Sequence, residues 1–291
     1  MTDTTSTTIP TEQAVRLRLA VAQTSHRGDP GDAAAFAAAG EEVRTLMTRA
    51  KDAGADLVQF CETTLCFPDK RRLSSDPDRM AEADWSRFAW EALDDQITRI
   101  ATHAAELGIW TVLGSQRRHG DGRPTTGLDV IDDSGAIVAR YDERVLSHTK
   151  STWMYEAGSA PVVVTVRGVR IGLTSGLEVH FPELYSGLAD DGVDVVLFST
   201  AGPGAPGSGD AFAAEARAHV STCRLWIGYA TSADHAVEAP SGVLAPSGWA
   251  ARCSTEVVPD VVVADVLDDA DDQGRAWRLS VRRSHPALSG R

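Results

Sequence analysis

The chain has 291 residues, with 28 Lys and Arg against 41 Asp and Glu, so its formal net charge is −13. This charge repels nucleic-acid phosphates and anionic membrane surfaces, so neither nucleic acid nor a membrane is expected as a partner. No apolar run is long enough to cross a bilayer, and the first residues lack the pattern of a signal peptide, which predicts a cytoplasmic protein. Four cysteines without paired metal spacing indicate free thiols, and neither a metal site nor a cofactor is predicted.

The chain predicts an alternation of strands and helices that is interrupted by hairpins. A polar, Thr-rich stretch suggests a disordered leader over residues 1–15, followed by one domain over 16–291. Apolar runs predict strands at 16–25, 55–62, 109–118, 193–200, 225–233 and 257–267. Helical periodicity predicts helices at 31–54, 84–108, 181–192 and 210–224. Turn residues predict hairpins at 127–143, 160–175 and 241–254, and a basic tail follows at 275–288. The pattern favours an α/β fold with mixed sheets buried on both faces.

Several separated motifs of the chain resemble those of the nitrilase (carbon–nitrogen hydrolase) superfamily, in the same order. They include "LRLAVAQTS", "ADLVQFCET", "GLDVIDDSGAIVARYDERVL", "RIGLTSGLEVHFPELY" and "SGVLAPSGWAA", and the similarity extends from Leu17 to the C-terminal tail. The resemblance implies a single-domain, four-layer α-β-β-α sandwich. It also implies a small-molecule substrate and assembly into a homodimer or a larger homo-oligomer.

The chemistry of that family uses a Cys nucleophile, a Glu that acts as general base and acid, and a Lys that stabilises the tetrahedral intermediate. The resemblance places the Glu at Glu62, at the end of a buried strand. Such a carboxylate is poorly solvated and its pKa is expected to be raised, which suits proton transfer. Without the resemblance, a strand-end carboxylate that caps the next turn would be the simpler interpretation.

The family Lys is not found at its expected position. In "YDERVL" that position holds Glu143, so a positive charge is replaced by a negative one. Lys150 follows in the next loop and would have to reach back, whereas a solvated loop lysine is the more common outcome. The family's second Glu matches the chain near Ser151. The loss of a cation also suggests a cationic substrate as one hypothesis.

The family nucleophile is missing, because counting from either side of the motif puts Gly176 at its position. The neighbouring Ser175 faces the opposite side of the strand and is not expected to replace it. Cys61 precedes Glu62 and is expected to face away from it. The substitutions at 143 and 176 together indicate that the covalent chemistry of the family has been removed.

The residues expected to bind substrate around this site are Gly176, Leu177, His180, Thr200 and Gly202. Gly202 stands where the family often has an aromatic residue, so we expect a roomier pocket. His180 replaces a family Arg and would titrate near neutral pH, although a structural histidine fits the pattern equally well. A metal bound by Glu62, Glu143 and His180 has no spacing motif behind it.

Three interpretations of function follow. The first is an enzyme that uses Glu62 and Glu143 as a coupled acid and base on a small nitrogen-containing substrate, without a covalent intermediate. Its reactions would include cyclisation, imine or amidine chemistry, or hydrolysis by an activated water. The second is an inactive homologue that binds a ligand or a partner protein. The third is an amidase with an unusual nucleophile. Fold alone does not choose between them.

Overall fold

Two six-stranded sheets lie face to face in the computed structural model, which describes residues 14–120, 122–202, 209–268 and 272–285. The first sheet has the order β12-β1-β2-β3-β4-β5 and the second the order β11-β10-β9-β8-β7-β6. The strands of the first sheet are β1 (Val15–Gln23), β2 (Leu57–Gln59), β3 (Trp110–Arg117), β4 (Thr125–Ile131), β5 (Ile137–Asp142) and β12 (Asp260–Leu267). Those of the second sheet are β6 (Val163–Val166), β7 (Val169–Ser175), β8 (Val195–Ser199), β9 (Trp226–Ala230), β10 (Gly242–Ala245) and β11 (Gly248–Arg252).

Each sheet has a parallel centre and antiparallel edges. Strands β1, β2 and β3 run parallel in the first sheet, as do β7, β8 and β9 in the second. The predicted hairpins form the antiparallel pairs β4–β5, β6–β7 and β10–β11. Because the carboxyl ends of parallel strands carry the loops that build sites in such sheets, the ends of β2, β7, β8 and β9 are the places to look for chemistry.

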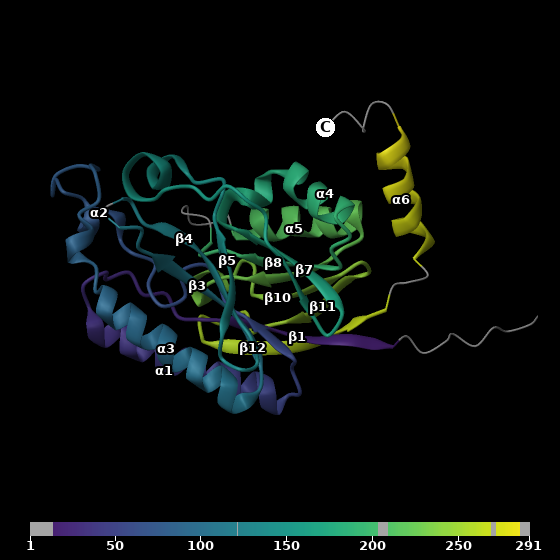
Figure 1. Cartoon of the computed structure of the whole chain (residues 1–291), viewed down its shortest axis with the longest axis horizontal. Helices are drawn as coiled ribbons and strands as arrows, with labels where there is room; N and C mark the ends of the chain where they lie inside the picture. The colour runs from purple at the N-terminus through teal and green to yellow at the C-terminus, as the bar shows by residue number, and fades with distance from the viewer. Residues whose placement is uncertain (1–13, 121, 203–208, 269–271, 286–291) are drawn as a thin grey trace, which may run out of the picture.

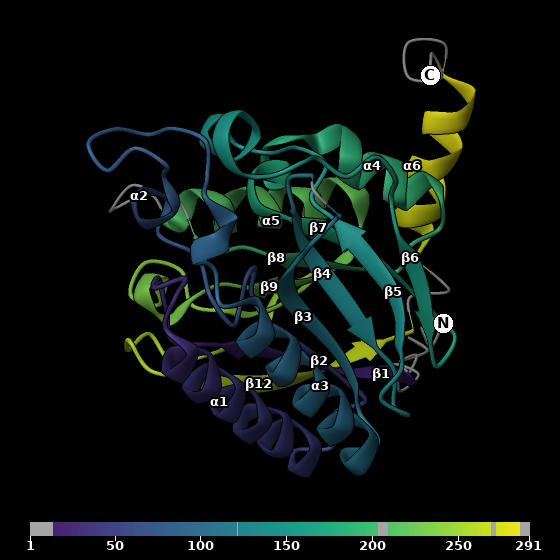
Figure 2. The same cartoon turned by 60° about the vertical axis from the view of Figure 1, so that its left-hand side comes forward.

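Helices cover the outer face of each sheet (Figure 1). Helices α1 (Ala33–Asp52) and α3 (Trp90–Leu107) lie side by side over the first sheet, as Figure 2 also shows. Helices α4 (Pro182–Asp190) and α5 (Gly209–Cys223) cover the second sheet. The short elements are α2 (Lys70–Leu73), η1 (Trp85–Arg87), the π-helical turn η2 (Lys150–Met154), η3 (Gly176–His180) and η4 (Ala233–His235). The layers are therefore α, β, β and α, which confirms the predicted fold class.

Three apolar cores hold these layers together. One lies between α1, α3 and the first sheet, where Phe36 and Ile100 are fully buried. The second lies between the two sheets and joins Leu19 and Val112 to Leu173. The third packs α4 and α5 on the second sheet around Phe198. Complete burial of strands on both faces explains why they read as continuous apolar runs in the sequence.

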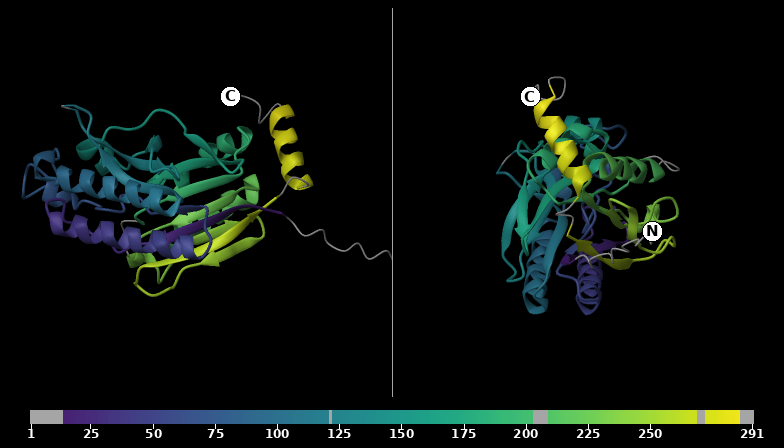
Figure 3. Two further views of the ribbon diagram at one scale, coloured as in Figure 1. Left: turned by 60° about the horizontal axis from the view of Figure 1, so that its bottom comes forward. Right: turned by 90° about the vertical axis from the view of Figure 1, so that its right-hand side faces the viewer.

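The C-terminal helix α6 (Gln273–Ser284) stands at the edge of the sandwich beside α4 (Figure 3). Arg282 joins the two helices through an ion pair with Asp190 at 2.7 Å, and Arg275 pairs with Asp194 at 3.2 Å. The predicted basic tail thus contains a helix that contacts an acidic edge. The predicted leader lies almost wholly outside the described residues, and its last residue, Val15, belongs to β1. Among the described helices, none has the length and apolar character that a bilayer crossing requires.

Candidate functional site

A cavity of about 460 Å³ opens where the loops after β2, β7, β8 and β9 meet. Its lining residues are His26, Glu62, Phe67, Lys70, Ser147, Lys150, Gly176, Leu177, Thr200, Ala201, Gly202, Phe212, Asp234, His235 and Glu238. Five of the seven predicted site residues are among them: Glu62, Gly176, Leu177, Thr200 and Gly202. The structure therefore brings these five residues together around one cavity.

Lys150 is the centre of the charged network at the bottom of this cavity. Its ammonium donates to Oε1 of Glu62 and to Oε2 of Glu143, the latter at 2.6 Å. Lys150 is only 6% exposed, and both carboxylates are buried as well. The expectation of a solvated loop lysine is therefore wrong, and the site does contain a cation. The hypothesis of a cationic substrate assumed that the site had lost its cation, and Lys150 removes that assumption.

The sequence favoured a solvated lysine because nothing local buries Lys150. The turn η2 that begins at Lys150 is held by bonds from other segments: Arg123 donates to the carbonyl oxygen of Ser151 at 2.8 Å, and the backbone N–H of Ala83 donates to that of Trp153 at 2.9 Å. Ser151, which the motif placed at this point, is exposed and donates to the carbonyl oxygen of His148 at 3.2 Å.

Glu62 follows β2 and faces the cavity with both oxygens engaged. Oε1 accepts from Lys150, and Oε2 accepts from the backbone N–H of Ala201 at 3.3 Å. The next residue, Thr63, has a φ of 49°, an uncommon value for a residue with a branched side chain. The chain therefore reverses sharply after Glu62 and leaves its carboxylate at the sheet end.

Glu143 lies behind the cavity wall and is fully buried. Burial raises the pKa of Glu143 to about 8, against the opposing effect of the Lys150 charge, and Glu62 raises it further. Its Oε1 has no hydrogen-bond partner among the described residues. Burial alone would lower the pKa of Lys150, but the two carboxylates outweigh it and raise that pKa. The network is thus one ammonium between two buried carboxyl groups, of which Glu143 holds its proton to a higher pH than an ordinary glutamate does.

Gly176 begins the turn after β7 with a φ of 57°, in the left-handed region that favours glycine. A Cβ at this position would overlap Oε1 of Glu143. The carboxylate of Glu143 therefore occupies the space that a side chain at residue 176 would need. This carboxylate explains the glycine more directly than relief of backbone strain does.

A second buried glutamate, Glu178, fixes residues 143 and 176 relative to one another. Its Oε1 accepts from the backbone N–H of Arg144 at 2.8 Å, and its Oε2 accepts from the backbone N–H of Ser175 at 2.9 Å and from the hydroxyl of Tyr141. One side chain thereby joins the end of β5 to the end of β7. A carboxylate with several donors in a buried place is a strong clamp.

Two of the predicted pocket residues need correction. His180 is not a lining residue: its side chain is partly exposed, Nδ1 lies 2.6 Å from Oε2 of Glu215, and its ring contacts Phe212 edge to face. The turn η3 directs it toward α5 rather than into the cavity, so it joins neither Glu62 nor Glu143. Gly202 does line the cavity, but a Cβ there would overlap the ring of His235. The space gained at residue 202 is therefore filled by His235, and the roomier pocket predicted from Gly202 is not found there.

Cys61 lies outside the cavity, as its sequence position suggested. Its Sγ is 3.2 Å from Oγ1 of Thr24, it is 3% exposed, and burial raises the pKa of its thiol to about 11. All four cysteines belong to the described residues, and none lines the cavity. Within the described part of the chain, no group of three His, Cys, Asp or Glu side chains is arranged to hold a metal ion.

The sequence alone missed much of the outer cavity wall, including His26, Lys70, Asp234 and His235. A signal was available for two of them, because "SADHAVE" follows β9 directly, just as Glu62 follows β2. Polar residues at the carboxyl ends of parallel strands converge on one edge of a sheet.

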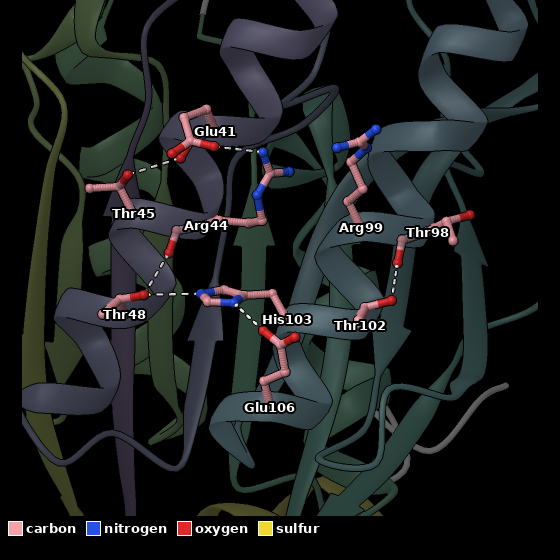
Figure 4. Close-up of a pocket in the computed structure, with 9 residues that line it drawn as sticks. All are labelled: Glu41, Arg44, Thr45, Thr48, Thr98, Arg99, Thr102, His103 and Glu106. Carbon is pink, nitrogen blue, oxygen red and sulfur yellow. Dashed lines mark hydrogen bonds and ion pairs between the residues drawn. The ribbon is translucent and has the colours of Figure 1, made fainter.

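A separate groove of about 510 Å³ lies between α1 and α3 on the outside of the first sheet (Figure 4). There Thr48 Oγ1 lies 3.0 Å from Nε2 of His103, whose Nδ1 lies 3.0 Å from Glu106. The order of hydroxyl, imidazole and carboxylate resembles the nucleophile, base and acid of a catalytic triad. The Thr48 hydroxyl, however, donates its proton to the carbonyl oxygen of Arg44 at 3.1 Å, so it accepts from His103 and is not activated by it. This arrangement braces the two helices and leaves the cavity at the sheet ends as the candidate site.

Comparisons with known proteins agree with this architecture. Residues 18–227 match the family model described as carbon-nitrogen hydrolase. The chain is 30% identical over 260 residues to Hydrolase Rv0480c and to Hydrolase MT0498 of Mycobacterium tuberculosis, which covers 85% of this chain and 85% of each relative. A mutant of an amidase from Nesterenkonia AN1, of the nitrilase superfamily, has a similar structure with a TM-score of 0.68 and 21% identity, over 91% of this chain and 98% of that one. A complex of the same amidase with butyramide gives a TM-score of 0.67 and 20% identity, over 91% and 97% of the two chains.

Proposed function

Since the chain belongs to the carbon–nitrogen hydrolase family, we propose that it hydrolyses a carbon–nitrogen bond of a small amide with a water molecule as the nucleophile. The observation that carries this proposal is the ammonium of Lys150, held between Glu62 and Glu143 beneath an elbow that has no side chain. A mutant of the Nesterenkonia amidase carries the acetamide moiety of fluoroacetamide covalently added at its active site cysteine. In this chain the elbow residue is Gly176, and the four cysteines lie outside the cavity.

Glu62 is the general base in this mechanism. It lines the cavity as a carboxylate paired with Lys150, so it can accept a proton from a water molecule beside Gly176. The water oxygen forms a bond to the amide carbon while its proton passes to Glu62. Glu62 then gives this proton to the leaving nitrogen, the carbon–nitrogen bond breaks, and the products are a carboxylic acid and ammonia or an amine.

Lys150 stabilises the oxyanion that forms on the substrate. An ammonium has three N–H donors, and two of them are directed to Glu62 and Glu143. The third remains for the substrate oxygen within a largely closed site, where a fixed donor has a large effect. Glu143 holds the ammonium in place from behind. The pKa of Glu143 is raised to about 8, so this carboxyl group is mostly protonated at neutral pH and does not cancel the charge of Lys150.

The test is the release of ammonia from a panel of small primary amides, both neutral and charged. We expect turnover that iodoacetamide does not abolish, no acyl adduct in the intact mass, and transfer of oxygen from labelled water to the acid in a single turnover. Glu62→Gln should lower the rate by roughly 100-fold or more, the size of a general-base contribution. Glu82→Gln is the matched control, because Glu82 pairs with Arg123 on the surface, outside the cavity, and its loss should leave the rate unchanged.

Two outcomes would contradict this function. An acyl adduct on a side chain would show covalent catalysis by another nucleophile. Tight binding of amides without turnover, unchanged in Glu62→Gln, would instead favour the ligand-binding interpretation.

A further inference from the structure

The cavity contains a second ammonium that the proposed mechanism does not use. Lys70 begins α2, is half-buried and lines the cavity, with its Nζ 6.0 Å from the ring centroid of Phe67. Within the residues that the structure describes, no carboxylate pairs with this ammonium and no acceptor bonds to it. Lys150, in contrast, pairs with two carboxylates.

The surroundings of Lys70 also carry an imidazole. His26 lines the same cavity, its ring lies 5.8 Å from that of Phe67, and it has no hydrogen-bond partner in the described part of the chain. Lys70 and His26 thus both lie beside the ring of Phe67 on the cavity wall. Besides Glu62, the acidic residues that line the cavity are Asp234 and Glu238, which come from the segment after β9.

The two carboxylates nearest to Lys70 are directed to another cation. Burial lowers the pKa of Lys70, the neighbouring Lys150 charge lowers it too, and Glu62 and Glu143 act against them. Both Glu62 and Glu143, however, form their ion pairs with Lys150. A half-buried cation without a fixed counter-ion gains most from an anion supplied by a ligand.

We propose that Lys70, assisted by His26, binds a carboxylate of the substrate, so that the preferred substrates are amides that also carry a carboxylate. This inference rests on the proposed hydrolysis for the fate of the amide, but the binding of the carboxylate stands apart from it. A singly charged carboxylate fits better than a doubly charged phosphate, because Asp234 and Glu238 line the same cavity. Short monoamides of dicarboxylic acids match the cavity volume of about 460 Å³.

Calorimetric binding to the Glu62→Gln protein tests the inference without requiring turnover. The probes are malonamate, succinamate and glutaramate, each compared with its uncharged diamide. We expect at least one monoamide to bind about tenfold more tightly than its diamide, the size of one charge-assisted hydrogen bond. This preference should be lost in Lys70→Met, be retained in Lys70→Arg, and weaken as salt is raised.

Arg71→Met is the matched control, since Arg71 is the next residue of α2, is exposed, and lies outside the cavity lining. It removes the same charge and should leave the preference intact. Equal binding of monoamides and diamides, no binding of any monoamide, or a preference that survives Lys70→Met would overturn the inference. Because the readout is binding, failure to find hydrolysis would leave this result standing, and failure here would leave the hydrolysis of neutral amides untouched.

Discussion

The carboxylate of Glu143 lies in the space that a side chain at residue 176 would need. Oε1 of Glu143 would overlap a Cβ built on Gly176, whose φ of 57° lies in a region that residues with a side chain adopt only rarely. Glu178 bonds to Arg144 and Ser175, the neighbours of these two residues, and so holds them in register. The glycine at 176 and the carboxylate at 143 are therefore coupled by packing.

Gly176→Cys should destabilise the protein and should not create a thiol-dependent amidase. We expect a loss of roughly 2–4 kcal/mol in the free energy of unfolding, because left-handed strain and overpacking both contribute. Urea denaturation measures this loss. Gly168→Cys is the control, since Gly168 has a φ of 81° and open space around its Cβ position, and it should show the strain alone. Adding Glu143→Ala should restore part of the stability at 176 and none at 168; equal losses at both positions would refute the clash.

Lys150→Met should destabilise the fold strongly at alkaline pH, because it leaves Glu62 and Glu143 buried without a cation. Breaking a buried ion pair by removing one partner costs about 3–5 kcal/mol. We expect the loss to shrink toward pH 5 as the carboxylates take up protons. Chemical denaturation across this pH range is the measurement. Lys51→Met, which removes a lysine bonded to the carbonyl oxygen of Gly108, should have a small effect that does not vary with pH; a matching pH dependence there would speak against the network.

Glu143 should make the stability of the protein depend on pH. Its pKa in the folded state is about 8, above the ordinary value of 4.5, so the folded protein binds more protons than the unfolded chain between these values. The free energy of unfolding should therefore fall as pH rises from 4.5 to 8 and change little from this source above 8. Subtracting the same curve for Glu143→Gln isolates the contribution. A difference that stays flat, or that rises with pH, would show that Glu143 is ionised throughout.

Gly202→Ala should disturb the cavity through His235. A Cβ at residue 202 would overlap the His235 ring, so the ring must move or the loop must shift, at a cost of about 1–3 kcal/mol. We expect weaker binding of amides as well, since both residues line the cavity. The pair Gly202→Ala and His235→Ala should be less than additive, whereas Gly248→Ala, at a glycine with open space around it, should be additive with His235→Ala. Additivity at residue 202 would exclude the contact.

Fold and site differ in how far the sequence determines them. The apolar runs that became β8 and β9 could be predicted from local pattern, because every residue of both strands is buried. Glu62 and Gly176 both line the cavity, Glu62 three residues after the end of β2 and Gly176 directly after β7. The burial of Lys150 could not be predicted in this way, because it depends on how a loop lies against Glu62, 88 residues earlier in the chain.

The positions of His180 and His235 could not be predicted from the sequence either. His180 is four residues beyond Gly176, yet the turn η3 sends it toward Glu215 on α5. His235 is far from Gly202 in the sequence, yet it fills the space beside that glycine. Neither outcome is contained in a local pattern, because each is decided by which segments meet in three dimensions.

The clamp formed by Glu178 has a consequence for substitutions at this site. Because Glu178 holds residues 143 and 176 close together, a side chain at 176 has to displace the carboxylate of Glu143. Shortening the side chain at 143 relieves that overlap but removes one of the two partners of Lys150. Each of the two changes therefore has a cost of its own, and neither position can be altered independently of the other.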